Sequence, residues 1–242
     1  MTDRANSFRV KLASGLLSSM SDMRVLGGVN AAAIRNAQGA WEIVQFASAE
    51  LVGENTYRLS RLLRGQQGSE AVMSSLLESG APFVLLNEAL VPLSRGIGDL
   101  GRGFHYRVAP AAHDVGSPQA TAIETTIGKT ALMPWQPANV TAKRSEAGIE
   151  ISWIRRTRIG GDSWDVAEVP LGEESEGYRV EIFDGEERVR SLETDVPHAL
   201  YLSADEMADF GAAQSSLVIG VAQLSAVAGP GHVRRAIIPT GI

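Results

Sequence analysis

A run of short alternating segments after residue 138 constrains the fold more than any other feature. In the segments 149–154 and 178–183, every second residue is apolar, which is the pattern of a strand with one buried face. The expected strands are 139–143, 149–154, 178–183, 188–193, 198–202, 217–224 and 233–238. About seven short strands in about 100 residues predict an immunoglobulin-like β-sandwich. The residues expected to face its core are Ile149, Ile151, Trp153, Tyr178, Val180 and Ile182.

The first half of the chain is also rich in strand patterns. Strands are expected at 8–13, 31–34, 41–47, 57–63, 82–87, 89–93, 105–108 and 120–126. Residues 41–63 should form a hairpin, with Trp41 in the core, and 70–79 a short helix with Val72, Leu76 and Leu77 inward. A second helix is expected from Ser203 to Phe210, opened by a capping box of Ser203 and Glu206. The fold class is therefore all-β.

A proline-containing linker, LMPWQPA, separates the two halves. Pro134 and Pro137 stiffen such a segment. We therefore expect a β-rich domain over 1–133 and the sandwich over 134–242.

Composition narrows the function classes. The chain has 242 residues and a formal net charge of −6. An acidic chain without a basic tail is a poor nucleic-acid binder, so no nucleic-acid partner is expected. No segment reaches the roughly 18–20 apolar residues of a membrane span, and the charged first residues do not predict a signal peptide. The absence of cysteine rules out disulfides and thiolate metal sites.

The motifs with catalytic associations lack their structural context. Gly96, Gly98 and Gly101 fit GxGxxG by letter, but a strand is expected after them where a dinucleotide site needs a helix. The four histidines show no metal-ligand spacing, and no GxSxG motif is present. We therefore expect no catalytic residues, no metal and no cofactor, and do not expect this region to be an enzyme.

A long charged loop between the second and third strands of the sandwich is the candidate site. Its residues are Arg155, Arg156, Arg158, Asp162, Trp164, Asp165, Glu173 and Glu174. Three interpretations stay open: charges that pair within the loop, an interface for another protein, or a calcium or sugar site. Pairing within the loop is the favoured interpretation, because charges of alternating sign lie close together in the sequence. An interface around Trp164 is compatible with such pairing, since Trp and Arg are enriched at interface hot spots.

The second half resembles a fibronectin type III module over about 136–239. Pro137 precedes the first strand, Trp153 lies on the second and Tyr178 on the third, and the run SLVIGVAQLSAVAGPG resembles the family's F strand and F–G turn. Leu217 and Ile219 occupy the region where that family usually has a tyrosine.

Two longer strings carry a second resemblance: NAAAIRNAQGAWEIVQFASAELVGENTYRLSRLLRGQQGSE and ISWIRRTRIGGDSWDVAEVPLGEESEGYRVEIFDG. They resemble the C-terminal region of the large baseplate, or tail-tip, protein of gene transfer agents and tailed phages. The resemblance implies a structural protein of a particle tail, made in the bacterial cytoplasm. It implies other tail proteins as partners, a homotrimer in the particle and contact with a host envelope glycan. The family's upstream hydrolase-like domain has no counterpart here, so its activity is not carried over.

Two alternatives stay open beside this structural role. One is a carbohydrate-binding or receptor-adhesion module that uses tryptophan as a stacking platform. The other is an accessory domain of a cell-wall hydrolase, which requires paired carboxylates about 5–9.5 Å apart.

Overall fold

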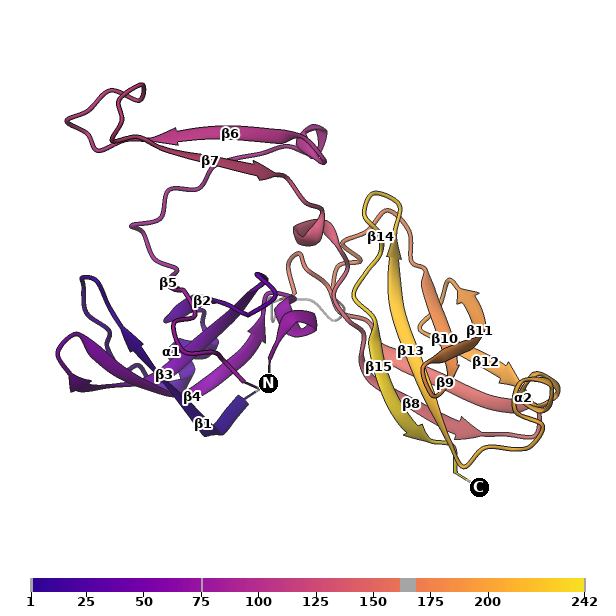
Figure 1. The fold of residues 1–242 in the computed structure, drawn as a ribbon. Helices are drawn as coiled ribbons and strands as arrows, with labels where there is room; N and C mark the ends of the chain where they lie inside the picture. The colour runs from indigo at the N-terminus through magenta and orange to yellow at the C-terminus, as the bar shows by residue number, and fades with distance from the viewer. Residues whose placement is uncertain (1, 75, 162–168, 242) are drawn as a thin grey trace.

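The computed structural model describes residues 2–74, 76–161 and 169–241. Their fold is all-β, built from one five-stranded sheet, a separate two-stranded hairpin and a two-layer sandwich (Figure 1). The predicted fold class is confirmed. The predicted domain division after residue 133 stays a prediction.

The five-stranded sheet is antiparallel, with strand order β1-β4-β3-β2-β5. Its strands are β1 (Thr2–Lys11), β2 (Ala31–Arg35), β3 (Trp41–Gly53), β4 (Thr56–Gln66) and β5 (Phe83–Leu85). The short helix α1 (Asp22–Leu26) lies between β1 and β2, and the 3-10 turn η1 (Ser69–Val72) follows β4. The predicted hairpin of β3 and β4 is confirmed.

The prediction that Trp41 lies in the core is wrong. The neighbouring positions Glu42, Val44 and Phe46 are buried, whereas the Trp41 side chain is 42% exposed. The burial of Glu42 explains the difference, because its carboxylate binds the Arg64 guanidinium and the Gly65 amide inside the sheet. A charged residue that is satisfied in this way occupies the position that hydrophobicity alone assigns to an apolar one.

Two further predictions in the first half were wrong. The predicted helix over 70–79 is only the turn η1, because Met73 leaves it in an extended conformation, and Leu76 is 76% exposed. The predicted strand over 89–93 is absent from the described chain. Asn87 forms a turn there, since its side chain accepts from the Ala89 amide and its carbonyl from the Leu90 amide.

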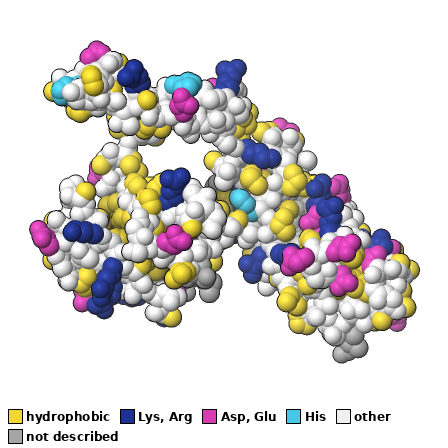
Figure 2. Space-filling view, in the orientation of Figure 1, with side chains coloured by type: hydrophobic (Ala, Val, Ile, Leu, Met, Phe, Trp, Pro, Cys, Tyr) yellow, Lys and Arg dark blue, Asp and Glu magenta, His cyan; other side chains and the backbone are white. Residues whose placement is uncertain are grey.

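The hairpin consists of β6 (Gly103–Val108) and β7 (Thr121–Thr126), preceded by the turn η2 (Ile97–Asp99). It stands apart from both larger bodies in Figure 1, and the chain returns from it through η3 (Thr130–Leu132) to the sandwich. Figure 2 shows the same hairpin as an arm that projects from the rest of the molecule.

The sandwich packs the sheet β12-β9-β8 against a sheet in which β13 pairs with β10, β14 and β15, and β10 pairs with β11. Its strands are β8 (Ala138–Arg144), β9 (Gly148–Ile154), β10 (Tyr178–Asp184), β11 (Glu187–Thr194), β12 (His198–Leu202), β13 (Ser216–Ser225), β14 (Gly229–Pro230) and β15 (Arg234–Pro239). All predicted strands of this half are present. The six predicted core residues are buried, at 5% exposure or less.

Helix α2 (Ser203–Phe210) follows β12 as predicted, but its predicted capping box is wrong. The N-cap is Leu202, which provides no side-chain cap. Glu206 turns instead into the protein, where it binds Arg144. For this buried carboxylate, a two-point contact with an arginine is worth more than a hydrogen bond from an exposed backbone amide.

Candidate functional site

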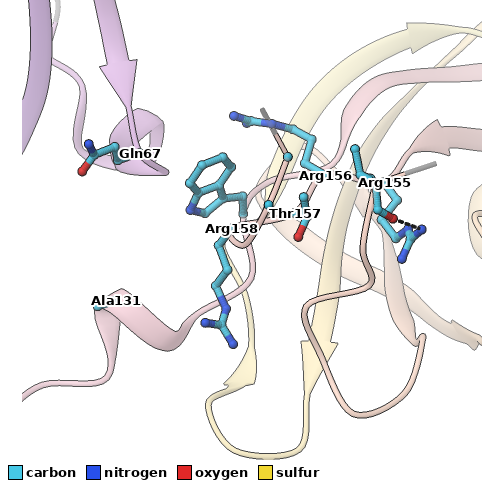
Figure 3. A pocket seen from close by; sticks show the side chains of 10 residues that line it. Gln67, Ala131, Arg155, Arg156, Thr157 and Arg158 are labelled. Atoms are coloured by element: carbon cyan, nitrogen blue, oxygen red, sulfur yellow. Dashed lines mark hydrogen bonds between the residues drawn. The ribbon is translucent and has the colours of Figure 1, made fainter. Parts of the chain in front are cut away.

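Three arginines leave the end of β9 in different directions (Figure 3). Arg155, Arg156 and Arg158 belong to the predicted charged loop. In the structure, each has a carboxylate partner within 4 Å. The directions differ because the chain leaves the regular strand after Ile154. The three cations therefore do not act as one positive cluster.

Arg158 and Arg155 pair inside the loop. The Arg158 Nε donates to Glu173 Oε1 at 3.0 Å, and its Nη2 donates to the Gly172 carbonyl at 3.2 Å. Arg155 Nη2 donates to the Val169 carbonyl at 2.9 Å. The Glu173 side chain is only 5% exposed, so these contacts fix the base of the loop rather than its surface.

Arg156 reaches out of the sandwich to the first half of the chain. Its Nη1 donates to Glu70 Oε1 in η1 at 2.6 Å. Its guanidinium also lies over the Trp135 ring, 5.0 Å from the ring centroid. One arginine just after β9 thus contacts two other parts of the chain. These are the turn after β4 and the connecting segment, which is defined here as residues 127–137 between β7 and β8.

Trp135 lies against Gly68 at the same junction. A β-carbon at Gly68 would be only 2.2 Å from Trp135 Nε1, so no larger residue fits there without displacement of the indole. Gly68 also has a left-handed backbone, with φ at 80°, which disfavours any other residue. The first sheet and the connecting segment are therefore in direct contact at a position that requires glycine.

An open groove with a volume of about 780 Å³ runs along this junction (Figure 3). Its walls include backbone and side chains from both halves. The lining residues are Gln67, Ala131, Trp135, Arg155, Arg156, Thr157, Arg158, Gly160, Gly161 and Val169. Since its three arginines already bind carboxylates, the groove provides mainly shape and hydrogen-bonding groups.

Tyr178 and Trp153 lie next to each other in the sandwich core. Their rings meet edge to face with centroids 5.1 Å apart. The Tyr178 hydroxyl donates to Glu176 Oε1 at 2.6 Å, and burial, followed by this carboxylate, raises the pKa of Tyr178. The phenol therefore stays protonated and acts as a structural donor.

A second set of charges surrounds α2. Arg190 on β11 donates to both oxygens of Asp209 at 2.6 and 2.8 Å, and the Tyr201 hydroxyl donates to the same carboxylate at 2.8 Å. The Arg190 guanidinium lowers the pKa of Asp209 from its usual 3.8, and Asp209 in turn raises that of Arg190. These contacts hold a helix against a sheet and leave no activated acid or base.

The remaining predicted site residues are not brought together. Glu174 is exposed on the loop. Asp162, Trp164 and Asp165 lie outside the described residues. Sequence reasoning missed the contact of Trp135 with Gly68 and the ion pair of Arg156 with Glu70. The glycine-rich turn GQQGSE and a tryptophan between two prolines were the available signals, but they lie far apart in the sequence.

No group of three or more His, Asp or Glu side chains is arranged to hold a metal ion within the described residues. In the same residues, no helix is long and apolar enough to cross a membrane.

Comparison with known proteins gives one family match. The model of the family described as Rcc01698-like, C-terminal, matches residues 1–84 of the 242. This region contains β1 to β4 and all of β5 except its last residue, Leu85. No curated protein matches the sequence.

Among solved structures, the FN1–FN3 domains of chicken CNTN1 share 11% identity with a TM-score of 0.33. That alignment covers all of this chain, which spans 64% of the length of the CNTN1 chain. Domains d3–d4 of the extracellular region of rat CD45 share 9% identity with a TM-score of 0.32, covering 80% of this chain and 94% of that one. The fibronectin type III-like assignment of the sandwich rests on its own strand pairing.

Proposed function

We propose that this chain is a structural component of a phage-like tail tip or baseplate, in a gene transfer agent or a prophage particle, and that it works by contact rather than catalysis. The longer of the two tail-tip-like strings begins at Asn30 and ends at Glu70, inside the region that the Rcc01698-like family model matches. The fibronectin type III-like sandwich suits a structural or adhesive role.

The observation that carries this proposal is a long stretch with no core of its own. From residue 69 to residue 133, no described residue is buried. The stretch nevertheless contains the regular hairpin of β6 and β7. An isolated two-stranded hairpin is at best marginally stable in water, so its natural surroundings should include another protein.

The hairpin has two chemically distinct faces. Phe104, Tyr106 and Val108 share one face, and Ile123 lies directly opposite Tyr106 on the neighbouring strand. Val108 is 58% exposed and Ile123 is 47% exposed. The other face carries the exposed polar pair of His105 and Glu124, with His105 Nδ1 3.0 Å from Glu124 Oε1.

Arg95 covers only part of the apolar face. Its guanidinium lies 4.5 Å from the Phe104 ring centroid and donates to the Tyr106 hydroxyl at 2.6 Å. The rest of the face is available to neighbouring tail proteins, or to other copies of the chain in a homotrimer.

Immunogold electron microscopy of particles from the source bacterium tests the proposal. An antibody raised against the purified chain should label one end of the tail. Mass spectrometry of the same particles should detect the chain. Particles that lack the chain, or label distributed along the tail, would contradict the proposal.

A glycan-binding module is the second candidate, favoured by the exposure of Trp41 on β3. An exposed indole is a suitable stacking surface for a sugar ring. Glycan-array binding by the purified chain that disappears in Trp41→Ala would support this function. Equal binding by both proteins would exclude Trp41 as the sugar platform.

A further inference from the structure

The connecting segment that carries Trp135 belongs mechanically to the sandwich. Three hydrogen bonds tie it to the turn between β13 and β15: Lys129 Nζ to the Ala228 carbonyl at 2.7 Å, His232 N to the Pro134 carbonyl at 3.1 Å, and Gln136 Nε2 to the Val233 carbonyl at 2.8 Å. Gly231 packs so closely that a β-carbon there would lie 2.5 Å from the Pro134 carbonyl oxygen. Any movement of the sandwich therefore moves Trp135 with it.

We propose that Trp135 and Arg156, together with Gly68 and Glu70, form a catch that holds the sandwich in one orientation on the first sheet. When the catch is broken, the sandwich swings as an intact body while both halves stay folded. The proposed catch does not depend on the tail-tip function, because it concerns the isolated chain.

The first half of the catch is the contact of the indole with Gly68. Gly68 lies at the start of η1, and that turn is fixed to the first sheet by Ser69, whose hydroxyl donates to the Gln66 carbonyl and accepts from the Ile43 amide. The surface that receives Trp135 is thus rigid. Because the Trp135 indole lies directly against the backbone of Gly68, this contact sets the distance between the two halves.

The second half of the catch is the ion pair of Arg156 and Glu70. Glu70 packs against Gly65, where a β-carbon would lie 2.9 Å from Glu70 Cγ, so the stem of its side chain lies against the end of β4. The Arg156 guanidinium also lies over the Trp135 ring, so the same side chain contacts both Glu70 and Trp135. The pair therefore sets the rotation of the sandwich about the junction.

The catch is weak enough to open. The Arg156 and Glu70 side chains are 31% and 24% exposed, so water and salt reach the pair. The second carboxylate oxygen of Glu70 is buried without a hydrogen-bond partner among the described residues. The cost of burying this oxygen reduces the net stability of the contact between the two halves. Small polar contacts between domains permit relative motion by default.

Distance measurement by double electron–electron resonance tests the catch. The chain contains no cysteine, so Glu54→Cys and Asp195→Cys introduce two unique labelling sites, one at the turn between β3 and β4 and one in the turn before β12. The otherwise unaltered chain should give one narrow distance distribution. Trp135→Ala and Glu70→Gln should each at least double its width, and their combination should broaden it further.

Matched controls separate the catch from general loosening. Trp41→Ala removes an exposed tryptophan from the first sheet, and Glu193→Gln removes the partner of Arg179 within the sandwich. Both should keep the narrow distribution, and circular dichroism should show both halves folded in every variant. A broad distribution in the unaltered chain, an unchanged width in the Trp135→Ala and Glu70→Gln double variant, or equal broadening in the controls would overturn the proposal.

Discussion

Arg144 on β8 and Glu206 on α2 form a two-point ion pair, with both N···O distances at 2.9 Å. The Glu206 side chain is 2% exposed and also accepts from the Gln214 amide at 2.7 Å. Arg144 in turn donates to the Gln214 carbonyl. The pair therefore connects the first strand of the sandwich to α2 and to the segment that leads into β13.

Removal of the arginine should destabilise the sandwich strongly. Arg144→Ala leaves the Glu206 carboxylate buried without its cation, and such a loss costs about 3–5 kcal/mol of unfolding free energy. Arg179→Ala is the matched control, because the Arg179–Glu193 pair is exposed and should contribute less than about 1 kcal/mol. Urea unfolding of both variants measures the difference. Equal decreases in unfolding free energy would show that the buried pair stabilises the protein no more than the exposed pair does.

The stability of the sandwich should fall in acid. Hydrogen bonds from Arg144 lower the pKa of Glu206 below its usual 4.5, and those from Arg190 lower the pKa of Asp209 below 3.8. A lowered folded-state pKa stabilises the protein above the unfolded-state value, and that contribution disappears as pH falls through the folded-state pKa.

Urea unfolding at a series of pH values should therefore show a constant contribution above about pH 5 and a progressive loss below pH 4. The Glu206→Gln and Asp209→Asn double variant should be less stable at pH 7 and should lose less on acidification. A double variant with the same acid slope as the unaltered chain would contradict this assignment.

The sandwich was predictable because its signal is local. Alternation along 149–154 and 178–183 identifies the buried faces without knowledge of their partners, and the structure buries Ile151 and Val180 as expected. The helix at α2 was also predictable from its sequence. The partner of Glu206 was not, since Arg144 lies 62 positions away.

The junction was not predictable for the same reason. Arg156 and Glu70 are 86 positions apart, and no periodic pattern relates them. The sequence predicted pairing within the charged loop, and the structure confirms it for Arg158 with Glu173. It gave no sign that the neighbouring Arg156 pairs across to the first half. Spacing along a chain reports on strands and turns, whereas contacts between separate bodies depend on the completed fold.

Gly148 should tolerate no side chain. Its φ is 153°, and a β-carbon there would lie 2.1 Å from the Tyr201 carbonyl oxygen on the paired strand. Gly148→Ala should therefore lower the unfolding free energy by about 1–3 kcal/mol through overpacking and backbone strain. Gly98→Ala, with open space around its position, should change stability by less than about 0.5 kcal/mol. Thermal unfolding compares the two, and equal melting temperatures would contradict the predicted strand contact.

The projecting hairpin should be the first part of the free chain to be cleaved. Arg102 and Arg107 are exposed, and no described residue from 69 to 133 is buried, so local opening there costs little free energy. Brief trypsin treatment followed by mass spectrometry should find cuts after these two arginines before any cut within 138–239. If the hairpin docks on a tail protein, the same cuts should become at least ten times slower in intact particles. Equal cleavage rates in free chain and particle would show that the hairpin remains uncovered there, and the apolar face of β6 and β7 would then have no role in assembly.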